Sequence, residues 1–257
     1  KRPERIRQRN TQTGRGDGAR MAEVAGAALV GLDKFYGHVL SRDVMTNDGL
    51  WPYPQVDVIC AASIVVDAAA QRFTDEGIGG IWITNAIAGL DDPLSATAVF
   101  DATVWDRAKS SDLVPPNPAL IEAGGTVHQA DTIEALAQIA GLDQNALEAT
   151  IATFNEAVRN GTLQSLSPAR REGGYEPVPI ETPPFRAIPL AAGITVTMGG
   201  IAIDAKARVL RPDDTPIPGL YAAGSTAGGM EGGPRAGYVG GLIKAFLLGL
   251  VAAETAA

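Results

Sequence analysis

Residues 217–225 read Ile-Pro-Gly-Leu-Tyr-Ala-Ala-Gly-Ser, residues 228–235 read Gly-Gly-Met-Glu-Gly-Gly-Pro-Arg, and residues 240–242 read Gly-Gly-Leu. This order predicts a short strand, a glycine loop and the start of a helix. A strand that ends in Gly224 lets a ligand approach the main chain, because glycine has no side chain in the way. The orphan N–H groups and the positive dipole end of a helix starting near Gly240 suit an anionic or electron-rich ring. The stretch therefore predicts a ligand site built mainly from backbone.

The rest of the chain divides into segments that differ in amino-acid composition and in the pattern of apolar residues. Of the 30 glycines, 13 fall between Gly193 and Gly249. In that part we expect strands at 201–204, 208–210 and 220–223, a turn at 216–219 and a helix from about residue 241. Before it, the patterns predict an alanine-rich helix over 17–29, a hairpin over 56–73, a strand at 96–100, two aspartate-capped helices over 131–140 and 143–159, and irregular, proline-rich structure over 161–189.

Composition limits the class of protein. A chain of 257 residues, 46% of them apolar, can form one or two globular domains. Its formal charge of −8 argues against a general nucleic-acid binder. The single cysteine, Cys60, excludes an intrachain disulfide framework and favours a reducing compartment, while the two histidines lack the spacing of a zinc site. We therefore expect no metal.

The longest apolar stretch, residues 239–253, is shorter than the roughly 20 residues of a membrane span. It predicts a buried helix and no membrane span. Because the chain starts at Lys1 rather than at methionine, we expect that an N-terminal part is missing. A cytoplasmic location is expected, with export left open.

The ordered string at residues 217–242 resembles the C-terminal flavin-binding element of the fumarate reductase, succinate dehydrogenase and 3-ketosteroid dehydrogenase flavoproteins. Other stretches resemble the same group in the same order: 16–22, 64–66, the Arg-Phe-x-x-Glu motif at 72–76, and Thr-Met-Gly-Gly at 197–200. The resemblance implies an α/β and α+β fold, with part of a Rossmann-like FAD-binding domain and an inserted α+β capping domain. It implies FAD-domain portions at 1–54 and 193–257 and a capping, substrate-binding domain at 55–192.

One expected motif is absent from these 257 residues. A strand followed by Gly-x-Gly-x-x-Gly, which would hold the FAD pyrophosphate, does not occur. The resemblance places that fingerprint before the region matching residue 1. We therefore expect it on a missing N-terminal segment or on a second chain that completes the FAD site.

The resemblance also assigns site residues. Arg235 occupies the place of an arginine that clamps a substrate carboxylate or carbonyl, and Tyr238 resembles a tyrosine that polarises a carbonyl or transfers a proton. The alternatives are an arginine bonding loop carbonyls or Glu231, and a half-buried tyrosine bonding the main chain. Thr197 joins Arg235 and Tyr238 as a substrate-binding candidate. The predicted cofactor-binding residues are Gly224, Ser225, Gly240, Gly241, Leu242 and Ile243.

Departures from the group narrow the chemistry. Residues 194–196, Ile-Thr-Val, replace the histidine that precedes Thr-Met-Gly-Gly in fumarate reductases. Ile59 and Cys60 stand where the group has an Arg-Gly-rich lead into the capping strand. Gly79 and Gly80 stand where the proton-donating arginine follows the Arg-Phe-x-x-Glu motif. These differences argue against dicarboxylate reduction. Arg72 and Glu76 match the motif, and we expect them to act structurally, as an ion pair or through backbone hydrogen bonds.

The resemblance thus implies an FAD-dependent oxidoreductase acting on a small-molecule substrate. It would move a hydride between a CH–CH group next to a carbonyl, as in a 3-ketosteroid or another enone, and flavin N5. Two alternatives stay open. One is a fumarate-reductase-like reductase of an unsaturated carboxylate. The other is a non-catalytic fragment or subunit that completes a flavin site with a partner chain.

Overall fold

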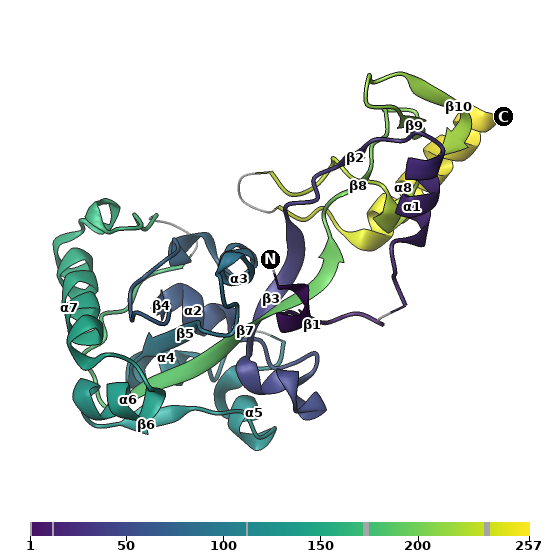
Figure 1. Cartoon of the computed structure of the whole chain (residues 1–257). Coiled ribbons are helices and arrows are strands. Elements are labelled where there is room, and N and C mark those ends of the chain that lie inside the picture. Colours follow the sequence, from purple (N-terminus) through teal and green to yellow (C-terminus); the bar gives the residue numbers. More distant parts are fainter. Residues whose placement is uncertain (1, 12, 112, 172–174, 234–236) are drawn as a thin grey trace. The chain divides into compact units, whose positions relative to one another are not determined.

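A computed structural model describes residues 2–11, 13–111, 113–171, 175–233 and 237–257 (Figure 1). The chain forms two compact units. The first, called unit 1, comprises residues 1–9 and 37–193, and the second, unit 2, comprises residues 10–36 and 194–257. Each unit is described by itself.

The sheet of unit 1 is organised around β7 (Phe185–Thr197), the long green arrow in Figure 1. Ala187 of β7 is paired antiparallel with Val99 of β5 (Thr97–Phe100) on one side and with His128 of β6 (His128–Ala130) on the other. The remaining strands of this sheet are β1 (Arg7–Gln8), β3 (Phe35–Ser41) and β4 (Ile64–Val66).

The α-helices described in unit 1 are α2 (Asp57–Ala62), α3 (Gly80–Gly89), α4 (Ala102–Arg107), α5 (Pro116–Glu122), α6 (Ile133–Ala140) and α7 (Gln144–Asn160). Leu136 of α6 and Leu147 and Phe154 of α7 are buried in one apolar cluster with Ile64 and Val99 of the sheet. Leu147, Ile151 and Phe154 recur at helical spacing along α7, so they form the core face of this helix.

Unit 2 is smaller and is built from short antiparallel pairs. β2 (Leu29–Val30) pairs with β8 (Gly200–Ile201), and β9 (Arg208–Leu210) pairs with β10 (Pro216–Tyr221). Two helices, α1 (Asp17–Val24) and α8 (Gly241–Ala256), accompany them. Its core cluster consists of Ala22, Ala27, Ile201, Val209, Ala222 and Ala227. The predicted strand at 208–210 and the helix from residue 241 are confirmed.

Two longer predictions for unit 1 were wrong in part. Residues 57–62 form a helix where we expected hairpin strand, and the strand is limited to residues 64–66. The expected turn is present, because Val66 pairs antiparallel with Arg72 across it. The run is almost fully buried, so it shows no amphipathic period that could separate a strand from a helix. Residues 185–189 belong to β7 instead of an irregular segment. Pairing with strands on both sides outweighs the local effect of the prolines there.

Smaller corrections concern the ends of elements. α1 stops at Val24 instead of Leu29, because Gly26 adopts a φ of 91° soon after its end. Thr132, not Asp131, caps α6, whereas Asp143 caps α7 as expected. The expected turn at 216–219 lies within β10, which begins at Pro216, a position where a strand tolerates proline.

Helix α8 differs from the expected buried helix. Leu242 and Phe246 are 77% and 76% exposed, and Ile243, Leu247 and Leu250 are also exposed. The described residues therefore leave many of the apolar side chains of α8 exposed, although its composition is that of a buried helix. Across the described part of the chain, the helices lack the combination of length and hydropathy that crossing a bilayer requires.

Candidate functional site

The predicted strand, turn and helix come together in unit 2. After β10 the chain passes through Ala222 and Ala223 into a short 3-10 turn, Gly224–Thr226. Gly224 has a φ of 71°, and a Cβ atom at this position would lie 3.4 Å from the Cβ of Ala245 in α8. The left-handed backbone favours glycine here, whereas a Cβ atom would make only an ordinary van der Waals contact with the helix. Ser225 follows as an exposed residue of the same turn.

The N-terminus of α8 is the second part of the site. Gly240 precedes the helix with a φ of 101°, and the first turn contains Gly241, Leu242 and Ile243. N–H groups in a first turn have no acceptor inside their own helix. The N–H of Gly241 donates to the hydroxyl of Tyr238 at 2.7 Å. The predicted catalytic tyrosine therefore sits at the helix start that is predicted to bind flavin.

Tyr238 is held by its ring as well as by its hydroxyl. The ring stacks on that of Tyr36, with centroids 4.0 Å apart and planes inclined by 14°. A phenol has two acceptor lone pairs and one O–H donor, so accepting from Gly241 does not use the proton. Tyr238 is 39% exposed. The main-chain bond that we weighed as the alternative is present, and it is compatible with donation to a substrate oxygen.

A buried ion pair links the glycine loop to the first turns of α8. Lys244 Nζ lies 3.0 Å from Glu231 Oε2, and both side chains are almost completely buried. The other oxygen of Glu231 accepts the N–H of Val239 at 3.4 Å. The sequence analysis missed this pair, although a lysine inside the apolar run 239–253 was a signal for a buried partner.

The other predicted substrate residues are placed as follows. Thr197 is the exposed last residue of β7, and its hydroxyl donates to the carbonyl of Gly199 at 3.3 Å. Arg235 lies outside the described residues, so its role stays a prediction. Glu231, the expected alternative partner of Arg235, pairs with Lys244.

Unit 2 also contains a pocket of about 410 Å³. It is lined by Val30, residues 202–205, Leu210, Asp214, residues 228–230 and Leu248. None of the predicted cofactor-binding residues lines it. Its lining includes the carboxylates of Asp204 and Asp214, which do not suit a phosphate group. We therefore do not assign this pocket to the flavin.

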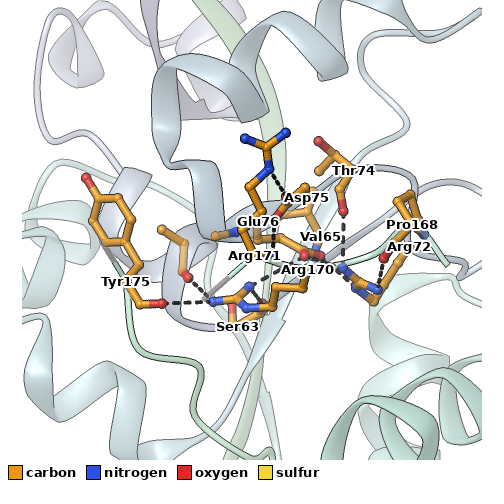
Figure 2. Close-up of polar contacts among 12 residues, drawn as sticks. Ser63, Val65, Arg72, Thr74, Asp75, Glu76, Pro168, Arg170, Arg171 and Tyr175 are labelled. Carbon is orange, nitrogen blue, oxygen red and sulfur yellow. Dashed lines mark hydrogen bonds and ion pairs between the residues drawn. The ribbon is translucent and has the colours of Figure 1, made fainter. Parts of the chain in front are cut away.

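The Arg-Phe-x-x-Glu motif at 72–76 forms a buried charge cluster in unit 1 (Figure 2). Arg72 contacts Glu76 through two nitrogens, at 2.5 and 3.0 Å. Arg170 Nη1 lies 3.5 Å from the same carboxylate, which also accepts the N–H of Val65 at 3.1 Å. The expected ion pair is thus present, and Arg170 is an addition that the sequence analysis missed.

The electrostatics of this cluster follow from its burial. Burial lowers the pKa of Arg170, and the charge of Glu76 acts in the opposite direction. Arg170 also donates to the carbonyls of Ala61 at 2.6 Å and Ser63 at 3.3 Å. The cluster therefore ties three segments of unit 1 together. The described residues contain no group of three or more potential metal ligands.

Comparisons with known proteins identify the family of this chain. Residues 9–238 match the family model described as FAD binding domain. The chain is 32% identical over 245 residues to the NADH:acrylate oxidoreductase of Vibrio harveyi, covering 94% of this chain and 23% of that protein. It is 29% identical over 272 residues to the 3-oxosteroid 1-dehydrogenase of Mycobacterium tuberculosis, covering 93% of this chain and 45% of that protein.

A solved structure is similar over nearly the whole chain. The open conformation of a flavocytochrome c3 fumarate reductase matches with a TM-score of 0.61 and 26% identity, over 98% of this chain and 41% of that structure. The chain thus spans less than half of each of these three proteins. Its relatives include fumarate-reductase-like and 3-ketosteroid dehydrogenase flavoproteins, and the chain belongs to the FAD binding domain family.

Proposed function

We propose that the protein is an FAD-dependent oxidoreductase that acts on a CH–CH group next to a carbonyl, as in a 3-ketosteroid or another enone. The observation that carries this proposal is the element formed by Gly224, Tyr238 and the start of α8. It combines a backbone open to a ligand with a phenol fixed at the positive end of a helix. The relatives, which include a 3-oxosteroid dehydrogenase, favour the same class of reaction.

The residues present fit a flavin. Gly224 and Gly240 have positive φ values, and a Cβ at Gly240 would lie only 3.2 Å from Ile243 Cγ2. A side chain at Gly240 would crowd Ile243, and one at Gly224 would face Ala245 of α8. We propose that Gly224, Ser225 and the first turn of α8, Gly241, Leu242 and Ile243, hold the flavin ring. FAD, when bound, would supply the hydride acceptor of the dehydrogenation.

The chain's own side chains would handle the substrate. Tyr238 would donate its hydroxyl proton as a hydrogen bond to the substrate carbonyl. Alternatively, as the phenolate, it would accept the proton from the adjacent carbon while the electrons of that C–H bond form the C=C bond. Arg235 would stabilise the developing enolate oxygen with a permanent positive charge. Thr197 would add a hydroxyl contact. Residues 55–192 are proposed as the capping domain that excludes water when substrate is bound.

A reductase of an unsaturated carboxylate is the first alternative. It is favoured by the similarity to an acrylate oxidoreductase and to a fumarate reductase structure. In this reading Arg235 would clamp a carboxylate. Full activity of an Arg235→Gln variant on fumarate or acrylate would count against it.

A fragment or subunit that completes its flavin site with a second polypeptide segment is the other alternative. It is favoured by the exposed apolar face of α8, where Leu242, Phe246 and Leu250 are uncovered, and by the absence of the pyrophosphate fingerprint from these 257 residues. Tight FAD binding by the 257-residue chain alone would remove this alternative.

The test combines flavin content with one substitution. FAD released on denaturation, with turnover of 4-androstene-3,17-dione, is expected for the protein. Tyr238→Phe is expected to keep its FAD and to lower kcat by about 10²–10⁴-fold. Tyr53→Phe, which removes a hydroxyl in unit 1, serves as the matched control. A Tyr238→Phe variant with wild-type kcat would rule out the proposed role of the phenol.

A further inference from the structure

Helix α8 buries a cation and leaves large apolar side chains exposed. Among the described residues of this helix, Lys244 alone is buried, whereas Leu242, Phe246 and Leu247 are all more than half exposed. Lysine is seldom buried without a partner, and the Nζ of Lys244 lies 3.0 Å from Glu231 Oε2. The two side chains are 4% and 0% exposed. The most deeply buried side chain of this apolar helix is therefore a paired cation.

An ion pair is a costly way to attach a helix. Removing two charges from water costs about as much as their attraction returns, so a buried pair adds little net stability. An apolar pair of similar volume often stabilises a fold equally well. A charge pair instead determines which atoms meet, and so it fixes the register of two segments. The residues next to Glu231 and Lys244 show which geometry this pair fixes.

A backbone bridge lies between Glu231 and Tyr238. The N–H of Gly232 donates to the carbonyl of Gly237 at 3.0 Å, and the N–H of Gly237 donates to the carbonyl of Gly232 at 2.7 Å. Glu231 immediately precedes this bridge, and Tyr238 immediately follows it. The two side chains therefore leave the chain at neighbouring points, although six residues separate them in the sequence.

The two residues that flank the bridge are both attached to α8. Glu231 is bound to Lys244, and the hydroxyl of Tyr238 accepts the N–H of Gly241 at 2.7 Å. The other carboxylate oxygen of Glu231 accepts the N–H of Val239, the residue after the tyrosine, at 3.4 Å. The bridge and the start of the helix thus close a ring of contacts that includes the phenol.

Within this ring, the ion pair is the attachment that water replaces least easily. Tyr238 is 39% exposed, so water can compete for the N–H of Gly241. The stack on Tyr36 sets the plane of the phenol ring, but stacked rings can shift sideways within that plane. Lys244 and Glu231 are shielded from water, and their attraction is therefore screened only weakly.

We propose that the Glu231–Lys244 pair is a positioning device for Tyr238. The inference rests on the proposed function and deepens it. Both charged side chains are almost completely buried, so they act through Tyr238, which keeps the catalytic role. The pair holds the phenol at the helix start where the flavin ring is proposed to bind. Such placement matters, because a displacement of about 1 Å can lower a rate by about 10²-fold.

The test uses the FAD-loaded protein, and its central variant replaces both charges. Glu231→Leu combined with Lys244→Met removes the pair without leaving an unpaired charge, so the urea midpoint should stay close to that of the wild type. Arg208→Met is the matched control, because it removes the cation of another ion pair of unit 2, formed with Asp204, which is partly exposed. Each variant is also made together with Tyr238→Phe.

Turnover provides the first readout. The probes are 4-androstene-3,17-dione for dehydrogenation, and fumarate and acrylate for the dithionite-reduced protein. We expect the double substitution to lower kcat by about 10–10²-fold, with KM and FAD content unchanged. Combined with Tyr238→Phe, it should cause no further loss, because the hydroxyl that the pair positions is already absent. Arg208→Met should leave kcat unchanged with either residue at position 238.

Amide hydrogen exchange provides a second readout, which does not depend on turnover. Exchange at Gly241, followed by ¹H–¹⁵N NMR, reports how often its hydrogen bond to the Tyr238 hydroxyl opens. We expect the double substitution to accelerate exchange at Gly241, because the tyrosine is held less firmly. Arg208→Met should leave this exchange rate unchanged.

The outcomes distinguish the two proposals. Wild-type kcat, or wild-type exchange at Gly241, in the double variant would overturn the role of the pair and leave the proposed function standing. An equal loss of kcat with and without the Tyr238 hydroxyl would show that the pair does not act through this residue. A wild-type protein without FAD, or one inert towards all three probes, would overturn the proposed function. The exchange rate would then still decide whether the pair holds the tyrosine.

Discussion

At the scale of single residues, Glu76 is a position in unit 1 where a substitution should be costly. It lies between the guanidinium groups of Arg72 and Arg170, and all three side chains are nearly inaccessible to solvent. Removing one member of a buried charge cluster is costly, because the remaining charges lose their partner without regaining water. The intact cluster itself adds little net stability, because the attraction between its charges is offset by the cost of removing them from water on folding.

We predict that Glu76→Gln lowers the free energy of unfolding by about 3–5 kcal/mol, because it leaves two buried cations with a neutral amide. Urea unfolding followed by circular dichroism measures the change. Asp106→Asn is the control, since its ion pair with Lys109 is exposed and its loss should barely move the urea midpoint. Equal midpoint shifts in the two variants would contradict the prediction.

His128 makes stability depend on pH. Burial lowers the pKa of His128 below its usual 6.5, and the charge of Arg42 acts in the same direction. Below pH 6.5 the unfolded chain therefore binds more protons at this residue than the folded chain does, so stability falls as the pH falls through this window. We predict that His128→Gln weakens the loss of stability between pH 7.5 and 5.5. Parallel urea midpoints for variant and wild type would contradict this.

At the scale of elements, the contact between the end of β10 and helix α8 positions the proposed flavin site. A Cβ atom built on Gly224 would lie 3.4 Å from the Cβ of Ala245 in α8, and the φ of Gly224, 71°, lies in the left-handed region. Gly249 lies further along the same helix, and a Cβ there meets nothing within 4 Å. Position 224 therefore requires glycine, whereas position 249 of the same strand–turn–helix unit can accept a side chain.

We predict that Gly224→Ala lowers stability by about 1–2 kcal/mol through left-handed strain and weakens FAD binding. Gly249→Ala should raise stability by about 0.5–1 kcal/mol, because alanine is the better helix former. Urea unfolding and FAD titration measure both effects. A stabilising Gly224→Ala would show that the strand end does not need its left-handed backbone.

At the scale of the whole molecule, the division into two compact units predicts separable stability. Unit 1 has its own apolar cluster, which includes Phe154 and Leu147, and unit 2 has another, which includes Ile201 and Val209. Chains with separate cores commonly depart from two-state unfolding. The charge cluster at Glu76 belongs to unit 1, and the Gly224 contact belongs to unit 2.

We predict two calorimetric transitions for the 257-residue chain. Glu76→Gln should lower the midpoint of one transition and Gly224→Ala that of the other, because each substitution disturbs a different core. Differential scanning calorimetry of the two variants and of the double variant provides the measurement. A single transition that moves with both substitutions would mean that the units unfold together.

The local sequence pattern was sufficient to predict the structural features that depend only on neighbouring residues. The helix start at Gly241 and the cap at Asp143 were both predicted, because capping and helical period act over a few residues. The family resemblance followed from the same short motifs. These features place the proposed flavin element without knowledge of the rest of the fold.

Contacts between distant residues were decided only by tertiary structure. Arg170 reaches Glu76 across 94 positions, and Asp57 fills the space beside Gly80. The helix at 57–62 and the central strand β7 likewise depend on burial against other elements. These contacts depend on burial and on electrostatic attraction between residues that are far apart in the sequence. The local sequence pattern around each residue does not identify its partner, so only the tertiary structure determines these pairs.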